Sequence, residues 1–339
     1  TRWLFKRLEW HLLGNHLFVN AKALAFSGLA FEGDEANRWL KRGLQIIDRE
    51  LPEQILPDGG NFERSPMYHA IFLEDILDLI NASQAWPDRI DTGRIQQWRD
   101  YAARMLGWLD GMSHPDGDIA LFNDAAIGIA PNLATLRAYA DRVLNQHLQP
   151  QKNRDNKAID LTHWADTGYI RIATSKAVAF LDAAPVGPDY LPGHAHADTL
   201  SFELSLFGQR VIVNGGTSRY GTGPERQQER DTRSHSTVEV DDENSSEVWG
   251  GFRVGRRAYP LDLFIEETPD SASVTCSHDG YRRLNGSPVH RREWRITPHT
   301  LDINDTISGH CKKAVARFIL HPTVRVQALI TNGWKLNLP

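Results

Sequence analysis

The sequence has few cysteines, no long apolar run and no block of like charge. Cys276 and Cys311 are the only cysteines in 339 residues. They could form a disulfide, but two cysteines in apolar, strand-like segments are more often simply buried. The cysteines therefore do not indicate whether the protein works in an oxidising or a reducing compartment. No run of 18 apolar residues occurs, which predicts no membrane-spanning helix. The net charge is −5 with basic residues dispersed, which argues against nucleic acid as a partner but allows a polyanionic sugar in a locally positive cleft.

The start of the chain has neither methionine nor a signal-peptide pattern. We therefore expect the sequence to be part of a longer protein, with both ends incomplete. Its length is sufficient for two domains, because single cores usually stop growing near 250–300 residues, an approximate limit. Oligomeric state cannot be predicted from these features.

Residues 1–150 have the pattern of a helical domain. Asp34 is expected to cap a helix, and Ser65-Pro66 is a typical helix start, with proline at the first position. Apolar residues recur at helical spacing after each of these points and again near Trp98 and Leu136. Short turns separate these segments, which favours antiparallel helix pairs.

Residues 150–158 are polar and aperiodic, and they are the expected linker. Residues 158–339 then alternate apolar and polar side chains in short runs, of which 201–206 is a clear example. Strands that follow one another without intervening helices indicate antiparallel sheets, so we predict an α+β multidomain protein that ends in a β-sandwich.

The densest group of potential ligands is the segment Gly193-His194-Ala195-His196-Ala197-Asp198. In an extended backbone the two histidines would point the same way, toward a metal ion or a substrate cleft. Asn214 and His235 lie near the ends of neighbouring predicted strands, where a sheet could bring them close to this segment. The alternative interpretation is a polar surface loop.

Two polar groups stand out in the helical half. Asn15 and His16 lie inside an otherwise apolar helical pattern, where they need hydrogen-bond partners; a satisfied pair in the core would explain them equally well. Tyr68 and His69 are expected in the first turn of a helix, where the helix dipole favours negative charge. A tyrosine there more often serves packing than catalysis.

Together these segments resemble the heparinase II/III-like polysaccharide lyases and their alginate-lyase relatives. The resemblance runs in order over most of residues 10–295. The matching stretches are HLLGNHLFVNAKAL (11–24), GGNFERSPMYH (59–69), PDGDIALFND (115–124), GPDYLPGHAHADTLSFEL (187–204), VIVNGGTSRYG (211–221), RSHSTVEVDDENSSEVWGGFRVGRRA (233–258) and GYRRLNGSPVHRREW (280–294).

The resemblance implies an incomplete α/α toroid followed by an antiparallel β-sandwich. It also implies a β-elimination at a uronic acid, in which the carboxylate is neutralised, a base removes the C5 proton and an acid protonates the leaving O4. Asn15 and His16 match the residues that neutralise the carboxylate, Tyr68 matches the acid, which is also the base for some substrate epimers, and His194 matches a base or carboxylate donor.

The predicted substrate is an anionic polysaccharide or oligosaccharide of bacterial metabolism, handled in the periplasm or outside the cell. The residues expected to contact it are Glu63, Arg64, His69, Asn123 and Tyr220. Arg219, Arg226, Arg230 and Arg233 could face the anionic sugar, or could equally be solvated.

A structural zinc ion is also implied, because metal-binding members of the family hold one with two histidines and an aspartate. His196 and His235 match the histidines, whereas Asn214 stands at the aspartate position. Two imidazoles and a neutral amide leave the charge of the ion uncompensated, which weakens zinc binding.

Two other functions remain open from the sequence. The first is a catalytically altered relative that binds or processes a surface polysaccharide during its biosynthesis. The second is a glycoside hydrolase on a helical scaffold, for which Glu63 and Asp124 are the available carboxylates.

Overall fold

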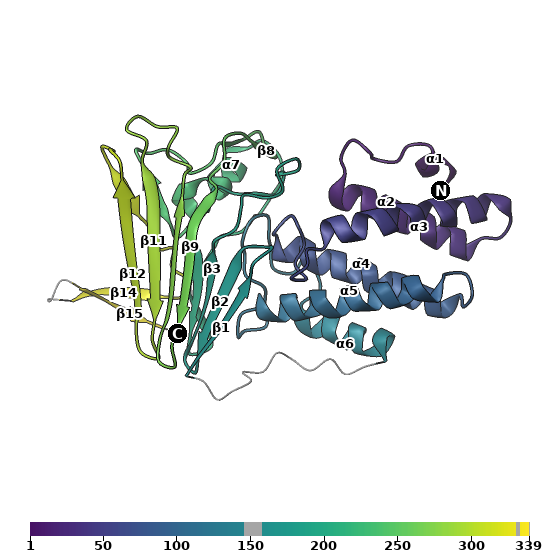
Figure 1. Ribbon diagram of the computed structural model, residues 1–339, viewed down its shortest axis with the longest axis horizontal. Coiled ribbons are helices and arrows are strands. Elements are labelled where there is room, and N and C mark those ends of the chain that lie inside the picture. Colours follow the sequence, from purple (N-terminus) through teal and green to yellow (C-terminus); the bar gives the residue numbers. More distant parts are fainter. Residues whose placement is uncertain (146–157, 330–332, 339) are drawn as a thin grey trace.

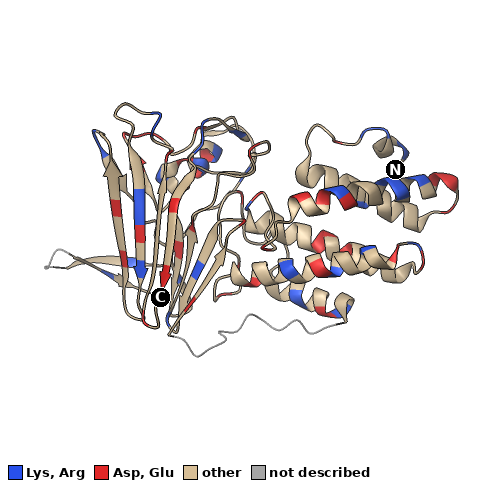
Figure 2. Ribbon diagram, in the orientation of Figure 1, with Lys and Arg blue, Asp and Glu red and all other residues tan. Residues whose placement is uncertain are grey.

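The structure, a computed structural model, describes residues 1–145, 158–329 and 333–338. A helical half packs end-on against a β-sandwich, so that the loops at one end of the helices meet one sheet of the sandwich (Figure 1). Lys and Arg are interspersed with Asp and Glu along the ribbons of both halves (Figure 2).

The helical half is built from antiparallel helices around one apolar core. Phe18, Leu73 and Trp98 are among its fully buried side chains. The helices are α1 (Arg2–Phe5), α2 (Gly14–Ala30), α3 (Asp34–Gln54), α4 (Pro66–Ala85), α5 (Thr92–Gly111) and α6 (Leu133–Leu144). In the described part of the chain, no helix is long and apolar enough to cross a membrane.

The helix starts explain two local differences from the sequence prediction. Ser65 caps α4 as predicted, since its hydroxyl accepts the Tyr68 N–H at 3.2 Å. Asp34 is not a cap, because Gly33 takes the cap position with a φ of 96° and leaves Asp34 as the first helical residue. Asn15 and His16 lie in the first turn of α2, whereas the apolar pattern predicted them inside a helix.

The sandwich consists of two antiparallel sheets. One sheet has the order β1-β2-β3-β4-β5 and the other the order β12-β11-β10-β9. Apolar residues between the sheets, such as Phe202 and Trp294, form their shared core. The strands of the two sheets are β1 (Ile159–Trp164), β2 (Tyr169–Thr174), β3 (Ala177–Asp182), β4 (Phe202–Leu206), β5 (Gln209–Ile212), β9 (Pro260–Glu267), β10 (Ala272–His278), β11 (Val289–Ile296) and β12 (Leu301–Ser308).

Shorter elements extend this frame. Two-stranded pairs join β6 (Val238–Val240) to β13 (Ala314–Ala316), β7 (Val248–Trp249) to β8 (Arg253–Val254), and β14 (Arg325–Leu329) to β15 (Gly333–Asn337). The helix α7 (Pro224–Arg230) and the 3-10 turn η1 (Thr232–Ser234) lie between β5 and β6. These insertions carry several of the residues that the site uses.

A mixed core joins the two halves. Trp108 from α5 packs with Trp164 from β1 and Tyr169 from β2 in one buried cluster. The turn between β1 and β2 also enters the helical half, where the backbone N–H and the hydroxyl of Thr167 donate to the Asp58 carboxylate at 2.7 and 2.9 Å. These contacts fix the edge along which the site forms.

The predicted fold class, a helical domain followed by an antiparallel β-sandwich, is confirmed. The expected linker falls mostly on residues 146–157, which lie outside the described part of the chain. Both cysteines are unpaired; Cys276 is buried in β10, whereas Cys311 lies in a loop rather than in the predicted strand.

Candidate active site

Tyr68 lies where the helical half meets the sandwich, in the first turn of α4. Its hydroxyl is hydrogen-bonded to the Tyr220 hydroxyl at 2.8 Å. Its ring stacks on the imidazole of His194, with 3.9 Å between ring centroids and 31° between planes. Burial raises the pKa of Tyr68, and the hydrogen bond with Tyr220 raises it further, so the phenol stays protonated at neutral pH.

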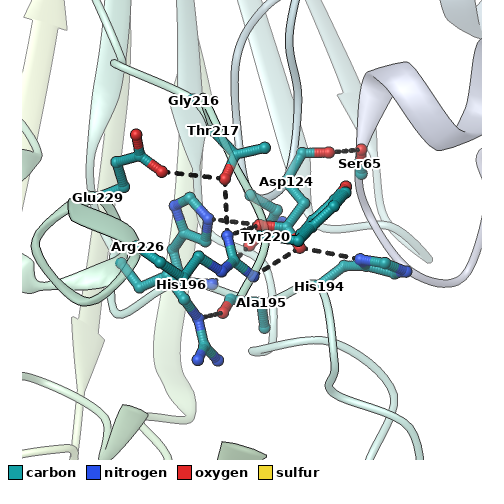
Figure 3. Close-up of polar contacts among 12 residues, drawn as sticks. Ser65, Asp124, His194, Ala195, His196, Gly216, Thr217, Tyr220, Arg226 and Glu229 are labelled. Atoms are coloured by element: carbon teal, nitrogen blue, oxygen red, sulfur yellow. Dashed lines mark hydrogen bonds and ion pairs between the residues drawn. The ribbon is translucent and has the colours of Figure 1, made fainter. Parts of the chain in front are cut away.

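His194 is held by the carboxylate of Asp124 (Figure 3). Its Nδ1 lies 2.9 Å from one Asp124 oxygen, and the Nε2 of His196 lies 2.9 Å from the other. A carboxylate can only accept, so Nδ1 of His194 carries the proton, and in the neutral ring Nε2 then has a free lone pair. The His194 side chain is 13 % exposed, whereas His196 is fully buried.

The guanidinium of Arg226, on α7, completes the carboxylate network. It contacts both oxygens of Asp124 and donates to the Thr217 hydroxyl at 2.7 Å. Burial alone would raise the pKa of Asp124, but hydrogen bonds from His194, His196 and Arg226 outweigh it and hold that pKa far below its usual range. Asp124 is therefore a permanent anion that orients two imidazoles.

Aromatic rings cover the same arginine. Its guanidinium carbon lies 5.3 Å from the ring centroid of Tyr220 and 5.6 Å from that of Phe252. Both rings are nearly half exposed. Arg226 thus supports Tyr220, the partner of Tyr68, as well as Asp124, the partner of His194.

The start of α2 lies beside Glu63, whose carboxyl group is near His194. A Cβ on Gly14 would lie 2.7 Å from the Leu191 side chain and 3.1 Å from an oxygen of Glu63, so the backbone next to Asn15 touches both. No side chain caps α2, which leaves the N–H groups of its first turn available to an anion. Burial raises the pKa of Glu63, although the nearby His194 opposes the change.

Some of the other residues predicted for the site lie in it, and others lie outside it. Tyr220 and Glu63 lie at the site described above. His16 lies on the exposed side of the α2 start, with its Nδ1 3.7 Å from the Glu9 carboxylate and no described contact to Tyr68 or His194.

Three residues predicted to contact substrate are instead used inside the protein. The Arg64 guanidinium donates to the carbonyls of Thr167 and Phe62 at 2.9 and 3.1 Å. His69 is fully buried between the Asn61 N–H and the Met105 carbonyl. The Asn123 amide accepts the His196 N–H and donates to the Arg64 carbonyl, so these three position the backbone around the site.

Two of the three predicted zinc ligands, His196 and His235, lie close together. The rings of His196 and His235 are 5.4 Å apart, and Nδ1 of His196 and both nitrogens of His235 are buried without a hydrogen bond of normal geometry in the described part of the chain. The Asn214 oxygen accepts the Gly216 N–H at 3.1 Å, which leaves it a second lone pair. No group of three His, Cys, Asp or Glu that could hold a metal occurs among the described residues.

Two residues of this site were missed or misassigned from the sequence. Asp124 was considered only as a carboxylate for the hydrolase alternative, although it ends the family-like PDGDIALFND stretch. Arg226 was grouped with arginines that could face a sugar, but it is 1 % exposed. Arg230 is likewise buried, with its guanidinium donating to the Ala195 carbonyl at 3.1 Å.

Family models match both halves of the chain. The model described as heparinase II/III N-terminus matches residues 2–146, and that described as heparinase II/III-like, C-terminal, matches residues 156–335. The chain belongs to the heparinase II/III family. The predicted family is thereby confirmed.

Named relatives are distant and longer than this chain. A heparin-sulfate lyase of Bacteroides stercoris is 24 % identical over 271 residues, which are 76 % of this chain and 40 % of the relative. A heparin-sulfate lyase of Pedobacter heparinus is 27 % identical over 254 residues, which are 68 % of this chain and 36 % of the relative.

Solved structures share the fold of the whole chain. A heparinase III superimposes with a TM-score of 0.75 at 19 % identity, covering 96 % of this chain and 50 % of the other. A heparan sulfate lyase from Pedobacter heparinus gives a TM-score of 0.72 at 20 % identity with the same coverage. The chain therefore spans half or less of the length of these proteins.

Proposed function

We propose that this protein cleaves a uronate-containing anionic polysaccharide by β-elimination. The observation that carries the proposal is the stacked pair of Tyr68 and His194, with His194 held by Asp124. This pair offers one proton donor and one proton acceptor at the junction of the two halves. The names of the relatives make heparin and heparan sulfate the first substrates to test.

His194 is the proposed base. With Nδ1 committed to the Asp124 carboxylate, its Nε2 accepts the C5 proton, and the anionic carboxylate stabilises the imidazolium that forms. The electron pair of the C5–H bond then forms the C4–C5 double bond as the C4–O4 bond breaks.

Tyr68 is the proposed acid. Its raised pKa keeps the phenol protonated until O4 departs, and it passes its proton to that oxygen. The Tyr220 hydroxyl, 2.8 Å away, is placed to donate to the phenolate that remains. In its resting state Tyr68 is poorly suited to be the base.

Asn15 and the uncapped start of α2 are the proposed partners of the sugar carboxylate. Electrostatic stabilisation of the enolate by a positioned donor typically contributes about 3–4 kcal/mol to lowering the barrier. Glu63 lies beside this helix start, and burial raises the pKa of its carboxyl group.

The hydrolase alternative requires two carboxyl groups that can exchange protons. Asp124 is unsuited to that role, since both of its oxygens are hydrogen-bonded to cationic or N–H donors.

The location of the protein in the periplasm or outside the cell stays a prediction.

The decisive assay follows the ultraviolet absorbance of the double bond that elimination creates. With heparan sulfate, the protein should generate this absorbance, and Tyr68→Phe should lower turnover at least about a hundredfold through loss of the acid. Tyr101→Phe, a change of the same kind on α5, is the matched control. Full activity in Tyr68→Phe, or new reducing ends without new absorbance, would overturn the assignment.

A further inference from the structure

Beside the start of α2 lies a basic aromatic surface, here called the Trp10 patch, made of Trp10, Arg42 and Arg49. Trp10 belongs to the loop between α1 and α2 and is 37 % exposed. The guanidinium carbons of Arg42 and Arg49 lie 5.1 and 4.8 Å from the centroid of its ring. The arginines are seven positions apart on α3, so they share one face and are separated by about 10 Å along the helix.

The two arginines of the Trp10 patch differ in their partners. Arg49 donates from two nitrogens to the carboxylate of its chain neighbour Glu50. The Arg42 side chain makes no hydrogen bond or ion pair with any described residue and stacks on the indole of Trp10. Stacking against an indole orders the Arg42 guanidinium without using its N–H donors, which stay available to an oxyanion.

A chain of hydrogen bonds connects the Trp10 patch to the proposed active site. Arg49 donates to the Glu50 carboxylate, which also accepts from the Gln54 amide at 2.9 Å. The same amide donates to the Gly14 carbonyl at 3.1 Å, directly before Asn15. Arg49 and Gln54 are five residues apart, about 7–8 Å along α3, a separation that a few linked sugar rings can span.

We propose that the Trp10 patch is a distal subsite that binds a sulfated or carboxylated ring of the same polysaccharide chain whose uronate reaches Asn15. The chain as a whole is acidic and its charges are mixed (Figure 2), so a polyanion depends on local basic surfaces of this kind. Two guanidinium groups carried about two helical turns apart match successive anionic groups along such a polymer. The inference rests on the proposed function for the identity of the polymer.

The test compares two double variants that remove the same charge. Arg42→Gln/Arg49→Gln removes the Trp10 patch, whereas Lys41→Gln/Arg104→Gln removes two exposed cations elsewhere in the helical half, one of which, Arg104, also stacks on an aromatic ring. Binding of heparin and of a heparin-derived disaccharide is measured by calorimetry at two salt concentrations in the Tyr68→Phe background, where turnover is expected to be slow.

Loss of the Trp10 patch should weaken heparin binding at least about tenfold and flatten its salt dependence, while the control pair changes binding less than about twofold. Disaccharide binding should be equal in all variants. Equal losses in both pairs, or unchanged heparin affinity without the patch, would overturn the subsite.

Turnover of the Tyr68-containing variants separates this inference from the proposed function. Without the patch, KM for the polymer should rise about tenfold with kcat preserved. If no unsaturated product forms in the parent protein but heparin binding still depends on the patch, the subsite stands and the lyase function falls. If the parent protein does not bind heparin at all, the subsite is refuted.

Discussion

Asp124 shows how a single side chain organises the candidate site. It lies in a loop of the helical half, yet its carboxylate contacts two histidines that precede β4 and an arginine of α7. A buried carboxylate with this many donors stays ionised and rigid. The proposed base is therefore positioned by residues from two other segments of the chain.

Asn15 tests the neutralisation of the sugar carboxylate. Asn15→Ala should lower kcat by roughly 10²–10³ with little change in melting temperature, because the lost donor acts mainly in the transition state. Asn20→Ala on the same helix is the control, since Asn20 hydrogen-bonds Glu9 on both its backbone and its carboxylate. The control should lose stability and keep kcat. The reverse pattern would assign Asn15 to packing.

Arg226 distinguishes a buried ion pair from a sugar contact. Arg226→Met leaves the Asp124 anion buried without its counter-ion and should cost about 3–5 kcal/mol in the free energy of unfolding. Arg219→Met is the control, because Arg219 is 60 % exposed and its pair with Glu225 should contribute at most about 1 kcal/mol. Denaturant unfolding measures both. A stable Arg226→Met protein that only shows a raised KM would favour the sugar-facing interpretation.

The sequence pointed to Tyr68 and His194, the proposed acid and base, more clearly than to the residues that hold them. Tyr68 and His194 stood in motifs that resembled a known family, whereas Asp124 was one of several aspartates in turns. The neighbouring sequence does not distinguish Asp124 from the other aspartates in turns, because its role depends on Arg226, which is 102 positions away in the chain. For the same reason, Arg64 and His69 seemed suited to substrate contacts until their buried partners were known.

At the scale of secondary structure, the start of α2 and the loops around β4 define the site. The apolar residues around Asn15 predicted the helix correctly but gave no sign that it begins at Gly14, where a φ of 49° follows the positive φ of Leu13. This difference matters because only the first turn of a helix has free N–H groups. Helix existence is fixed by periodicity, whereas the boundary depends on tertiary contacts to Leu191 and Glu63.

The zinc ligands that the family resemblance implies, His196, Asn214 and His235, allow a prediction about zinc. The purified protein should contain well under one equivalent of zinc, because two imidazoles and the neutral Asn214 amide leave the charge of the ion uncompensated. Asn214→Asp supplies the missing anionic ligand and should raise bound zinc toward one equivalent. Elemental analysis after dialysis measures the content. Stoichiometric zinc in the unmodified protein would show that the amide suffices.

At the scale of the whole molecule, one buried cluster that contains Trp108, Trp164 and Tyr169 joins the two halves. The sequence predicted both layers, because the apolar period changes from helical to alternating spacing. It could not predict how they pack, since the tryptophans that form the junction read as ordinary core residues of their own halves. The site depends on this packing because Tyr68 and His194 come from opposite halves.

Buried histidines make the fold sensitive to acid. Burial lowers the pKa of His69 to about 4, against 6.5 for an ordinary histidine. Between these two pH values the unfolded chain binds a proton at this histidine that the folded chain does not. The contribution of His69 to the free energy of unfolding is therefore fully present above about pH 6.5 and falls by about 3 kcal/mol as the pH drops to about 4.

His69→Gln removes this proton-linked term while still allowing hydrogen bonds to Asn61 and Met105. Denaturant unfolding at pH 7 and pH 5 should show a smaller loss of stability in the variant than in the parent protein. Identical losses would mean that other buried groups, such as His278, account for the acid sensitivity.

The most direct test of β-elimination is digestion of heparan sulfate followed by mass spectrometry of the fragments. Elimination breaks the C4–O4 bond without adding water, so we predict fragments with an unsaturated non-reducing end that are lighter by one water than the hydrolysis products of the same linkage. Fragments with the full mass of the hydrolysis products would contradict elimination. Intact polymer across the uronate polysaccharides would show that this junction of helices and sheet does not perform the chemistry.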